Sequence, residues 1–230
     1  MMPYWRVCII ESEKGLREII FQGGLEIGQL LDFSGWRILG ARHKTFCVNG
    51  HTHANAYSTL GVVTEHDLKP NDIAEVHVKV TPRELLHTTT AAKKYPRNAE
   101  SADHSTYYVT ATIIKDRDFG PEAFEPSKFT DPVILDLIEK TTVEADSSLS
   151  GYQAITEIKT KDGRCFQKHV KAVHGLNEDP LTDEELETKF RNMAIKYMSE
   201  NQIKEIFDTI WNLDKLDNIE ELTKLMVFPI

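Results

Sequence analysis

The stretch Ala154-Ile-Thr-Glu-Ile-Lys159, followed by Lys161-Asp-Gly-Arg164 and Phe166-Gln-Lys-His-Val-Lys-Ala172, decides the fold of this chain. Apolar and polar residues alternate on both sides of the central segment, which is the pattern of strands with one buried face. Asp-Gly between two such stretches is the strongest short-range signal for a β-hairpin. These residues therefore predict an antiparallel pair of strands.

A further strand is predicted upstream, where three valines alternate with polar residues over positions 75–80 and Pro82 then ends the pattern. Helical patterns lie between the strands, over residues 54–65, 105–115 and 132–140. Antiparallel strands interspersed with helices are typical of the α+β class. We therefore expect residues 41–174 to form an α+β domain with antiparallel strands.

The C-terminal region, residues 175–230, has only helical patterns. Thr182-Asp-Glu-Glu185 and Ser199-Glu-Asn-Gln202 both have the sequence of a capping box, and apolar residues follow each at helical spacing. A short third helix is expected around Leu222. Residues 1–40 are too short to cover the apolar surface of these helices, so we expect a homodimer or a complex with a separate helical subunit.

Composition limits the class of protein. The chain has 230 residues, with 27 Lys+Arg against 36 Asp+Glu and a formal net charge of −9. This balance, with no basic block, predicts neither a nucleic-acid partner nor an anionic membrane surface. No apolar run approaches the roughly 18 residues of a membrane span, and Met1–Ile10 lacks a small-residue cleavage site. Three widely spaced cysteines predict no disulfide framework, so a cytoplasmic location is expected.

The densest polar cluster runs from Arg42 to His53, directly before the helix expected at 54–65. A helix N-terminus presents free N–H groups and favours anions. Lys44, His51 and His53 would add side-chain donors, and together these groups suit a carboxylate or a phosphate. The cluster therefore predicts an anion site.

A second cluster, Ser101-Ala-Asp-His-Ser105, also opens a helix. Asp103 or Ser105 is a competent helix cap there. Asp103 beside His104 would orient a histidine base, or would simply cap the helix. Both interpretations stay open at the level of sequence.

Simpler interpretations exist for the first cluster as well. Thr52 and Asn49 are residue types that commonly serve as caps and turn residues, and a lysine such as Lys44 is usually a solvated surface residue. His51 and His53 have no third ligand at a recognised spacing, so no metal site is expected. Cys47 has no identifiable catalytic partner in the sequence.

The same residues resemble the MmgE/PrpD family, which includes 2-methylcitrate dehydratase, cis-aconitate decarboxylase and iminodisuccinate epimerase. The match is carried by four stretches in a coherent order: His43–His53, Leu68–Ile73, Lys94–Ser105 and Gly175–Arg191. The first is similar to the family's Lys-x-aromatic-Pro segment, which ends in Gly-His-Thr-His. The third contains the family's Ala-Asp-His-Ser helix start, and the fourth resembles its Pro-Leu-Thr-Asp-Glu-Glu-Leu region.

The resemblance implies an architecture for the whole chain. Family members have a large N-terminal helical domain, an α+β lid, and C-terminal helices that return to the helical domain. Residues 1–40 would then be the end of a largely missing helical domain, residues 41–174 the lid, and residues 175–230 the returning helices. Since the family's active site lies between helical domain and lid, only the lid half would be present.

The resemblance also implies a chemistry and a set of site residues. Family substrates are di- and tricarboxylic acids, and their reactions start at a carbon next to a carboxylate. Dehydration removes an α-proton and a β-hydroxyl group, decarboxylation or epimerisation uses the same carbanion-like intermediate, and no metal or organic cofactor is required. A lysine would stabilise the developing charge, and a histidine would move the proton. The predicted catalytic residues are Lys44, His53 and His104, and the predicted substrate-binding residues are Lys44, His51, Thr52 and Asp103.

One departure from the family pattern concerns the loop that aims the lysine. Cys47 stands where the family has proline, and proline would fix the backbone there. Two classes of function follow from the sequence. The chain is either a hydro-lyase or related carboxylate enzyme, 2-methylcitrate dehydratase-like, that needs a helical partner, or a non-catalytic truncated homologue that acts as a binding or assembly module.

Overall fold

The computed structural model describes residues 34–35, 40–177 and 179–227. The chain divides after Ala41 into two units, and every element named below belongs to the second, Arg42–Ile230. The segment predicted to end a missing helical domain, residues 1–40, lies almost wholly outside the described residues.

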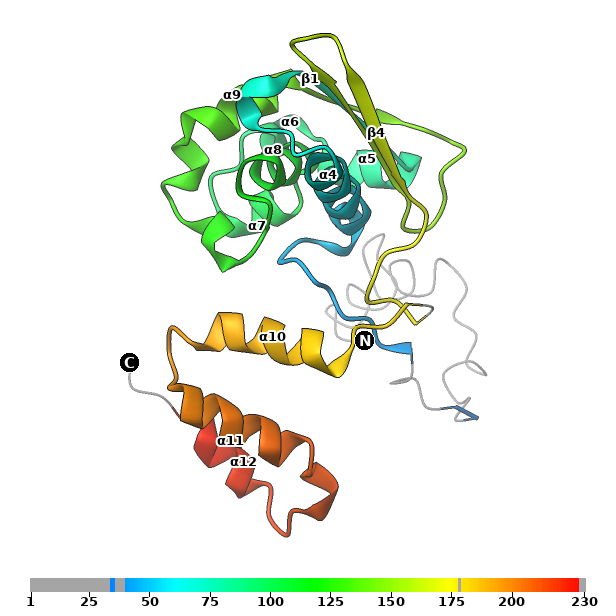
Figure 1. The fold of residues 1–230 in the computed structure, drawn as a ribbon. Helices are drawn as coiled ribbons and strands as arrows, with labels where there is room; N and C mark the ends of the chain where they lie inside the picture. The colour runs from blue at the N-terminus through cyan, green and yellow to red at the C-terminus, as the bar shows by residue number, and fades with distance from the viewer. Residues whose placement is uncertain (1–33, 36–39, 178, 228–230) are drawn as a thin grey trace, which may run out of the picture. The chain divides into compact units, whose positions relative to one another are not determined.

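The α+β region is built on a four-stranded sheet with the order β2-β1-β3-β4 (Figure 1). Its strands, in chain order, are β1 (Ile73–Val80), β2 (Thr141–Ala145), β3 (Ala154–Thr160) and β4 (Cys165–Val170). The predicted hairpin is confirmed: β3 and β4 are antiparallel, with Ile158 opposite Phe166. Gly163 supplies the positive φ of +89° that the turn requires.

The sheet differs from the expectation at one edge. β1 pairs with β3 antiparallel, as expected, but it pairs with β2 in parallel. β2 has only five residues, and its burial does not alternate regularly, so it carries little strand signal of its own. A parallel pair needs a long crossover, and here the crossover contains the helices between β1 and β2. The α+β class itself is confirmed.

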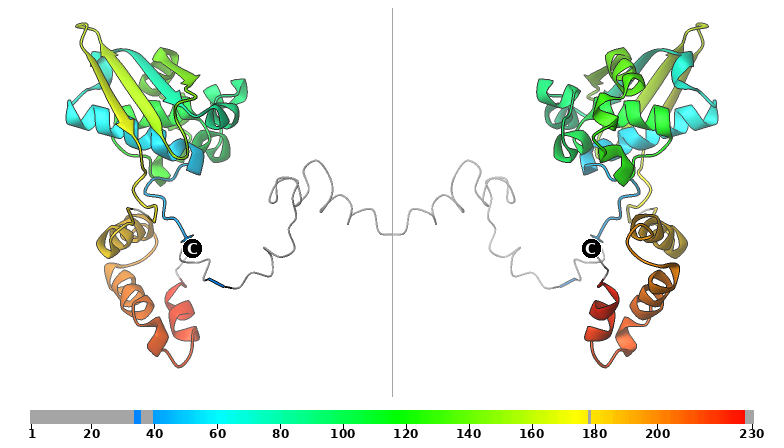
Figure 2. Two further views of the ribbon diagram at one scale, coloured as in Figure 1. Left: turned by 90° about the vertical axis from the view of Figure 1, so that its right-hand side faces the viewer. Right: turned by 90° about the vertical axis from the view of Figure 1, so that its left-hand side faces the viewer.

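Helices cover one face of this sheet, and the three predicted ones are present. They are α4 (His53–Glu65), α8 (Thr106–Asp116) and α9 (Pro132–Lys140). Figure 2 shows the strands on one side of the α+β region and the helices on the other. Val78 and Ile158 of the sheet and Ile113 of α8 lie in the core between them, with no exposed surface. Short helices complete the crossover: α5 (Pro82–Thr88), α6 (Ala91–Lys94) and α7 (Ala99–Asp103).

The outer face of the sheet explains why the polar residues alternate with valines. Glu75 of β1 lies opposite Lys159 of β3, and their side chains are 3.2 Å apart. Lys79 forms a similar pair with Glu144 of β2 at 3.6 Å. Cross-strand charge pairs of this kind stabilise a solvated sheet face modestly.

Three helices form the C-terminal region: α10 (Asp183–Ala194), α11 (Glu200–Ile210) and α12 (Glu220–Leu225). The capping box at Thr182 is confirmed, because Thr182 and Glu185 cap each other reciprocally. The second box is only half formed. Ser199 accepts from the Gln202 amide, but the Gln202 side chain donates instead to the carbonyl of Leu225 at 2.7 Å, an acceptor at the end of α12.

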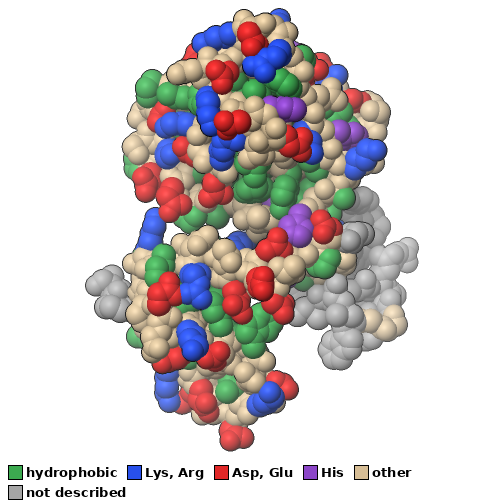
Figure 3. Space-filling model, in the orientation of Figure 1, with side chains coloured by type: hydrophobic (Ala, Val, Ile, Leu, Met, Phe, Trp, Pro, Cys, Tyr) green, Lys and Arg blue, Asp and Glu red, His purple; other side chains and the backbone are tan. Residues whose placement is uncertain are grey.

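These C-terminal helices leave apolar side chains exposed, as the sequence predicted. Ile203 and Ile206 are fully buried, whereas Tyr197, Trp211 and Ile219 are 61 %, 48 % and 57 % exposed. On the face shown in Figure 3, acidic and basic side chains are interspersed. Within the described ranges, no helix has the length and apolarity needed to cross a bilayer.

Candidate functional site on the lid

The loop that carries the first polar cluster is fixed by backbone hydrogen bonds at three points. The His43 amide donates to Gly175 at 3.0 Å, the Cys47 amide to Phe119 at 2.8 Å, and the Asn49 amide to Asp103 at 3.0 Å. These bonds tie the loop to three distant segments of the chain. The last one joins the two polar clusters that the sequence singled out.

Lys44 is exposed but bends back toward its own loop. Its Nζ donates a hydrogen bond to the carbonyl of Val48 at 2.7 Å, which uses one of the three N–H donors of the ammonium group. The carbonyl of Lys44 accepts a hydrogen bond from Lys189 of α10. Two cations therefore lie along this part of the loop, and Lys44 retains donors for a ligand.

His53 is buried at the start of α4, with 5 % of its surface exposed. Its Nε2 accepts a hydrogen bond from the Thr45 amide at 3.2 Å, and its ring packs against Phe46 and Tyr57. Burial, with further contributions from Lys44 and Lys189, lowers the pKa of His53 to about 4. At neutral pH His53 is therefore uncharged, and one ring nitrogen is already bonded to the loop.

His51 lies in a different environment, although it is only two residues away. Its ring stacks on His87 of α5, with centroids 5.3 Å apart and planes 20° apart. Burial lowers the pKa of His51, and so do its basic neighbours: His87, Arg83, His104 and Lys93. The charges that act on His51 and on His53 are thus different sets, so the predicted cluster separates into two groups.

His104 and Asp103 form a hydrogen-bonded pair at the end of α7. His104 Nε2 lies 2.7 Å from Asn49 Nδ2, and Asn49 Oδ1 accepts from the His51 amide, which fixes the orientation of the Asn49 side chain. Because Nδ2 can only donate, His104 Nε2 is the acceptor and Nδ1 carries the proton. Nδ1 donates to the Asp103 carboxylate, with the Glu100 carbonyl 2.9 Å away.

This pair resolves one choice that the sequence left open. Ser105, not Asp103, is the cap of α8, because its Oγ accepts from the Tyr108 amide at 3.0 Å. The Asp103 carboxylate is therefore free to orient His104. An aspartate that holds a histidine in one tautomer, with the other nitrogen as an acceptor, is the arrangement of an oriented base.

Thr52 connects the clusters from inside the protein. It is fully buried, and its hydroxyl donates to the carbonyls of Asn49 at 3.0 Å and Asp103 at 2.9 Å. The structure therefore shows Thr52 as a bridge between the loop and α7. Its predicted substrate contact would require these bonds to break.

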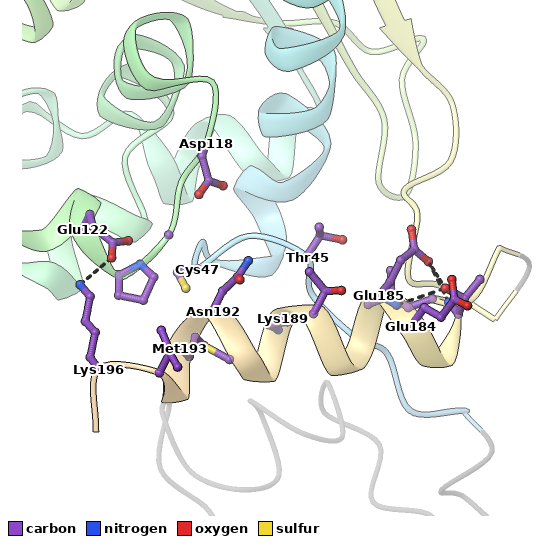
Figure 4. Close-up of a pocket in the computed structure, with 16 residues that line it drawn as sticks. Thr45, Cys47, Asp118, Glu122, Glu184, Glu185, Lys189, Asn192, Met193 and Lys196 are labelled. Carbon is purple, nitrogen blue, oxygen red and sulfur yellow. Dashed lines mark hydrogen bonds and ion pairs between the residues drawn. The ribbon is translucent and has the colours of Figure 1, made fainter. Parts of the chain in front are cut away.

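A pocket of about 750 Å³ lies beside the loop, between Thr45 and Cys47 on one side and α10 on the other (Figure 4). Lys189 and Asn192 of α10 face it, and an ion pair of 2.6 Å between Lys196 and Glu122 lies at its edge. Burial is the largest influence on the Cys47 thiol and raises its pKa. Neither polar cluster of the sequence includes residues of α10, and no local pattern in the sequence indicates that α10 packs beside this loop.

The described residues do not assemble a metal centre. Among these residues, no three His, Cys, Asp or Glu side chains come close enough together to hold an ion. The chemistry that the arrangement supports is instead the binding of anions by His51, Lys44 and nearby cations, and proton transfer at His104.

The described structure combines an α+β region, which carries an oriented histidine and cationic side chains, with C-terminal helices. Residues 46–213 match the MmgE/PrpD C-terminal domain. The match spans most of the chain, and the chain belongs to the MmgE/PrpD family.

The chain is similar to several cis-aconitate decarboxylases. It is 25 % identical to that of Homo sapiens over 194 residues, covering 81 % of this chain and 40 % of the relative. It is 24 % identical to that of Mus musculus over 141 residues, covering 60 % and 29 %. The Aspergillus terreus protein is 27 % identical over 169 residues, covering 70 % and 34 %. The matches thus span two fifths or less of each of these relatives.

Proposed function

We propose that this chain supplies the lid side of a lyase site for di- or tricarboxylic acids. The observation that carries the proposal is the Asp103–His104 pair beside the cationic surroundings of His51. Membership of the MmgE/PrpD family and the similarity to cis-aconitate decarboxylases support a carboxylate substrate. Turnover of the individual acids distinguishes among dehydration, decarboxylation and epimerisation.

His104 is the proposed proton acceptor. To act, its Nε2 exchanges the Asn49 amide for a hydrogen on the carbon next to a substrate carboxylate. The electron pair of the broken C–H bond passes into that carboxylate. In a dehydration it then expels the β-hydroxyl group, which takes the proton back from the His104 imidazolium and leaves as water. Asp103 stabilises the imidazolium that forms and keeps the ring in the required tautomer.

Lys44 is the proposed counter-ion for the charge that develops on the substrate carboxylate. Its ammonium gives up little when it turns from the Val48 carbonyl to a carboxylate. A charge-assisted hydrogen bond of this kind contributes about 1.5–3 kcal/mol. His53 acts as a positioning residue in this proposal, because its ring nitrogen holds the Thr45 amide next to Lys44.

A helical partner is part of the proposal. The exposed apolar side chains of the C-terminal helices, such as Trp211 and Ile219, need a covering surface, and the lid offers only one wall of a site. A separate subunit that supplies an N-terminal helical domain would meet both needs. A homodimer is the alternative, and it would also cover the exposed side chains of the helices.

The proposal is tested by turnover with and without such a subunit. The chain, alone and co-expressed with a family N-terminal helical domain, is assayed with 2-methylcitrate, citrate and cis-aconitate. We expect activity only in the complex, and a loss of at least about 100-fold in His104→Gln. The matched control is His66→Gln, since His66 stacks on Phe166 at the other end of α4. Equal activity of these two variants would refute the role of His104.

A binding assay tests Lys44 separately. We expect Lys44→Ala to weaken citrate binding by about tenfold or more, measured by calorimetric titration. The control is Lys159→Ala, an exposed lysine on the outer face of the sheet. Equal citrate affinities of the two variants would remove Lys44 from the site.

A second candidate function is a binding module without catalysis. The contact between His104 Nε2 and Asn49 Nδ2 favours it, because the acceptor nitrogen of the base is occupied. Under this alternative the complex binds citrate but does not convert any of the three acids. Asn49→Ala, which frees Nε2, would then produce no turnover either.

A further inference from the structure

Two residues of α5 that the proposed reaction does not use lie beside His51. Arg83 and His87 are one helical turn apart, at i and i+4, so they project from the same side of α5. His87 stacks on the His51 ring, and both Arg83 and His87 are exposed. They can therefore reach a ligand without displacing core residues.

The environment of these rings is strongly basic. The largest charge effects on His51 come from His87, Arg83, His104 and Lys93, and each of them lowers its pKa. Lys93 of α6 also donates to the His87 carbonyl, which holds that ammonium next to α5. The nearby Asp103 carboxylate is bonded to His104. Basic groups brought together in this way repel one another, and an anion bound among them removes the repulsion.

We propose that His51, Arg83 and His87 form a subsite for a second carboxylate group of a di- or tricarboxylic acid. The guanidinium of Arg83 matches a carboxylate in a bidentate manner, and each imidazole contributes one N–H donor. The proposal rests on the proposed function and names its substrate class. It adds α5 to the site, although neither polar cluster of the sequence includes α5.

Asn49 places this subsite next to the proposed base. Its Oδ1 accepts from the His51 amide at 2.9 Å, and its Nδ2 lies 2.7 Å from His104 Nε2. One side chain thus contacts both the backbone of the subsite and the proton acceptor. A substrate anchored by its second carboxylate at His51 and His87 would present the carbon next to its reacting carboxylate to His104. The subsite would therefore select polycarboxylates over monocarboxylates.

Anion binding at the stacked rings of His51 and His87 is expected to be coupled to the uptake of protons. A bound carboxylate offsets the basic neighbours of His51 on α5, on α6 and at the end of α7, so it raises the pKa of that ring. Binding therefore takes up protons, and affinity falls as the pH rises from 6 to 8. A structural role for the same stack would produce no such link to citrate.

The test is a titration of the full chain with citrate and with acetate at constant ionic strength. Histidine ring resonances in NMR spectra report weak binding, and calorimetry in two buffers of different ionisation enthalpy reports proton uptake. We expect Arg83→Gln and His87→Gln each to weaken citrate binding by about tenfold while acetate binding stays nearly unchanged. The controls are Arg164→Gln on the β3–β4 turn and His66→Gln, both at exposed positions.

Several results would overturn the subsite. One is equal citrate affinity of Arg83→Gln and Arg164→Gln, and another is equal binding of citrate and acetate by the unaltered chain. A third is the absence of any shift of the His51 and His87 resonances when citrate is added in about 20-fold excess to a chain concentration of about 1 mM. Different results would refute the proposed subsite and the proposed lyase function. Turnover lost in His104→Gln but kept in Arg83→Gln would refute only the subsite. Citrate binding lost in Arg83→Gln, with no turnover in any complex, would refute only the lyase.

Discussion

The α+β region and the C-terminal helices of this chain bury their apolar residues to different extents. In the α+β region, residues such as Val78, Leu137 and Ile158 have no exposed surface and belong to one continuous core. In the helices after residue 182, the buried apolar residues in the described range are few: Ala194, Ile203, Ile206 and Leu222. The first region closes a core of its own. The second region buries only these few apolar residues, and larger apolar side chains remain exposed to solvent. Exposed apolar surface of this kind is typical of an interface with another chain.

The largest expected effect compares a core residue of each region. Leu137→Ala removes a fully buried side chain from the α+β core, and we expect the free energy of unfolding to fall by about 2–5 kcal/mol. Ile206→Ala makes a similar cavity in α11, where we expect it to release only the C-terminal helices. Urea denaturation measures the first effect, and amide hydrogen exchange resolved by residue measures the second. A single transition that both variants lower equally would remove the distinction between the two regions.

The next effect concerns the backbone connection between the regions. Gly175 has a φ of +97°, and an added Cβ would lie 2.0 Å from the carbonyl oxygen of His43. Gly175→Ala should therefore cost about 3 kcal/mol of stability and disturb the hydrogen bond from the His43 amide to Gly175. Gly163→Ala is the matched control, because Gly163 has a similar φ of +89° but no atom within 4 Å of an added Cβ.

We expect Gly163→Ala to cost only about 1 kcal/mol, the conformational penalty alone. Thermal denaturation of the two variants gives the difference, and exchange of the His43 amide shows where it acts. Equal losses would mean that the close approach of His43 and Gly175 does not constrain the connection.

The smallest expected effect is a pH dependence at the same connection. His174 lies 2.9 Å from Asp179 and 3.0 Å from Glu185, which forms the capping box of α10 with Thr182. Burial lowers the pKa of His174, but hydrogen bonds to these two carboxylates outweigh it and raise the pKa above the usual value. The protonated ring therefore stabilises the folded state fully below about pH 6.5, and this contribution is lost as the pH rises through the raised pKa.

We expect the amide hydrogens of α10 to exchange faster at pH 8 than at pH 6, after correction for intrinsic rates. The difference corresponds to a decrease of about 0.5–1 kcal/mol in the free energy of local opening. His174→Gln should remove this dependence, and His66→Gln should keep it. An unchanged pH dependence in His174→Gln would assign the effect to other groups.

Local sequence predicted much of the fold and part of the candidate site. The Asp-Gly hairpin, the helices at α4, α8 and α9, and the cap at Thr182 depend on residues within a few positions of one another, so their patterns are visible along the chain. The edge strand β2 was not visible in this way. Its parallel pairing with β1 depends on a partner more than sixty positions away, as in the pairing of Val76 with Thr141.

The sequence by itself determined which residue types gather before α4 and at the end of α7, because caps, turns and charges are local properties. Only the tertiary structure decided which partners these side chains contact. It turned His53 inward onto Thr45 and placed His51 against His87 of α5, a residue far from both polar clusters in the chain. It also directed the side chain of Gln202 to the Leu225 carbonyl at the end of α12, rather than to the N-terminus of its own helix. The physical reason is the same in each case: a polar side chain bonds the partner that packing brings nearest, and packing joins segments whose separation along the chain carries no local pattern.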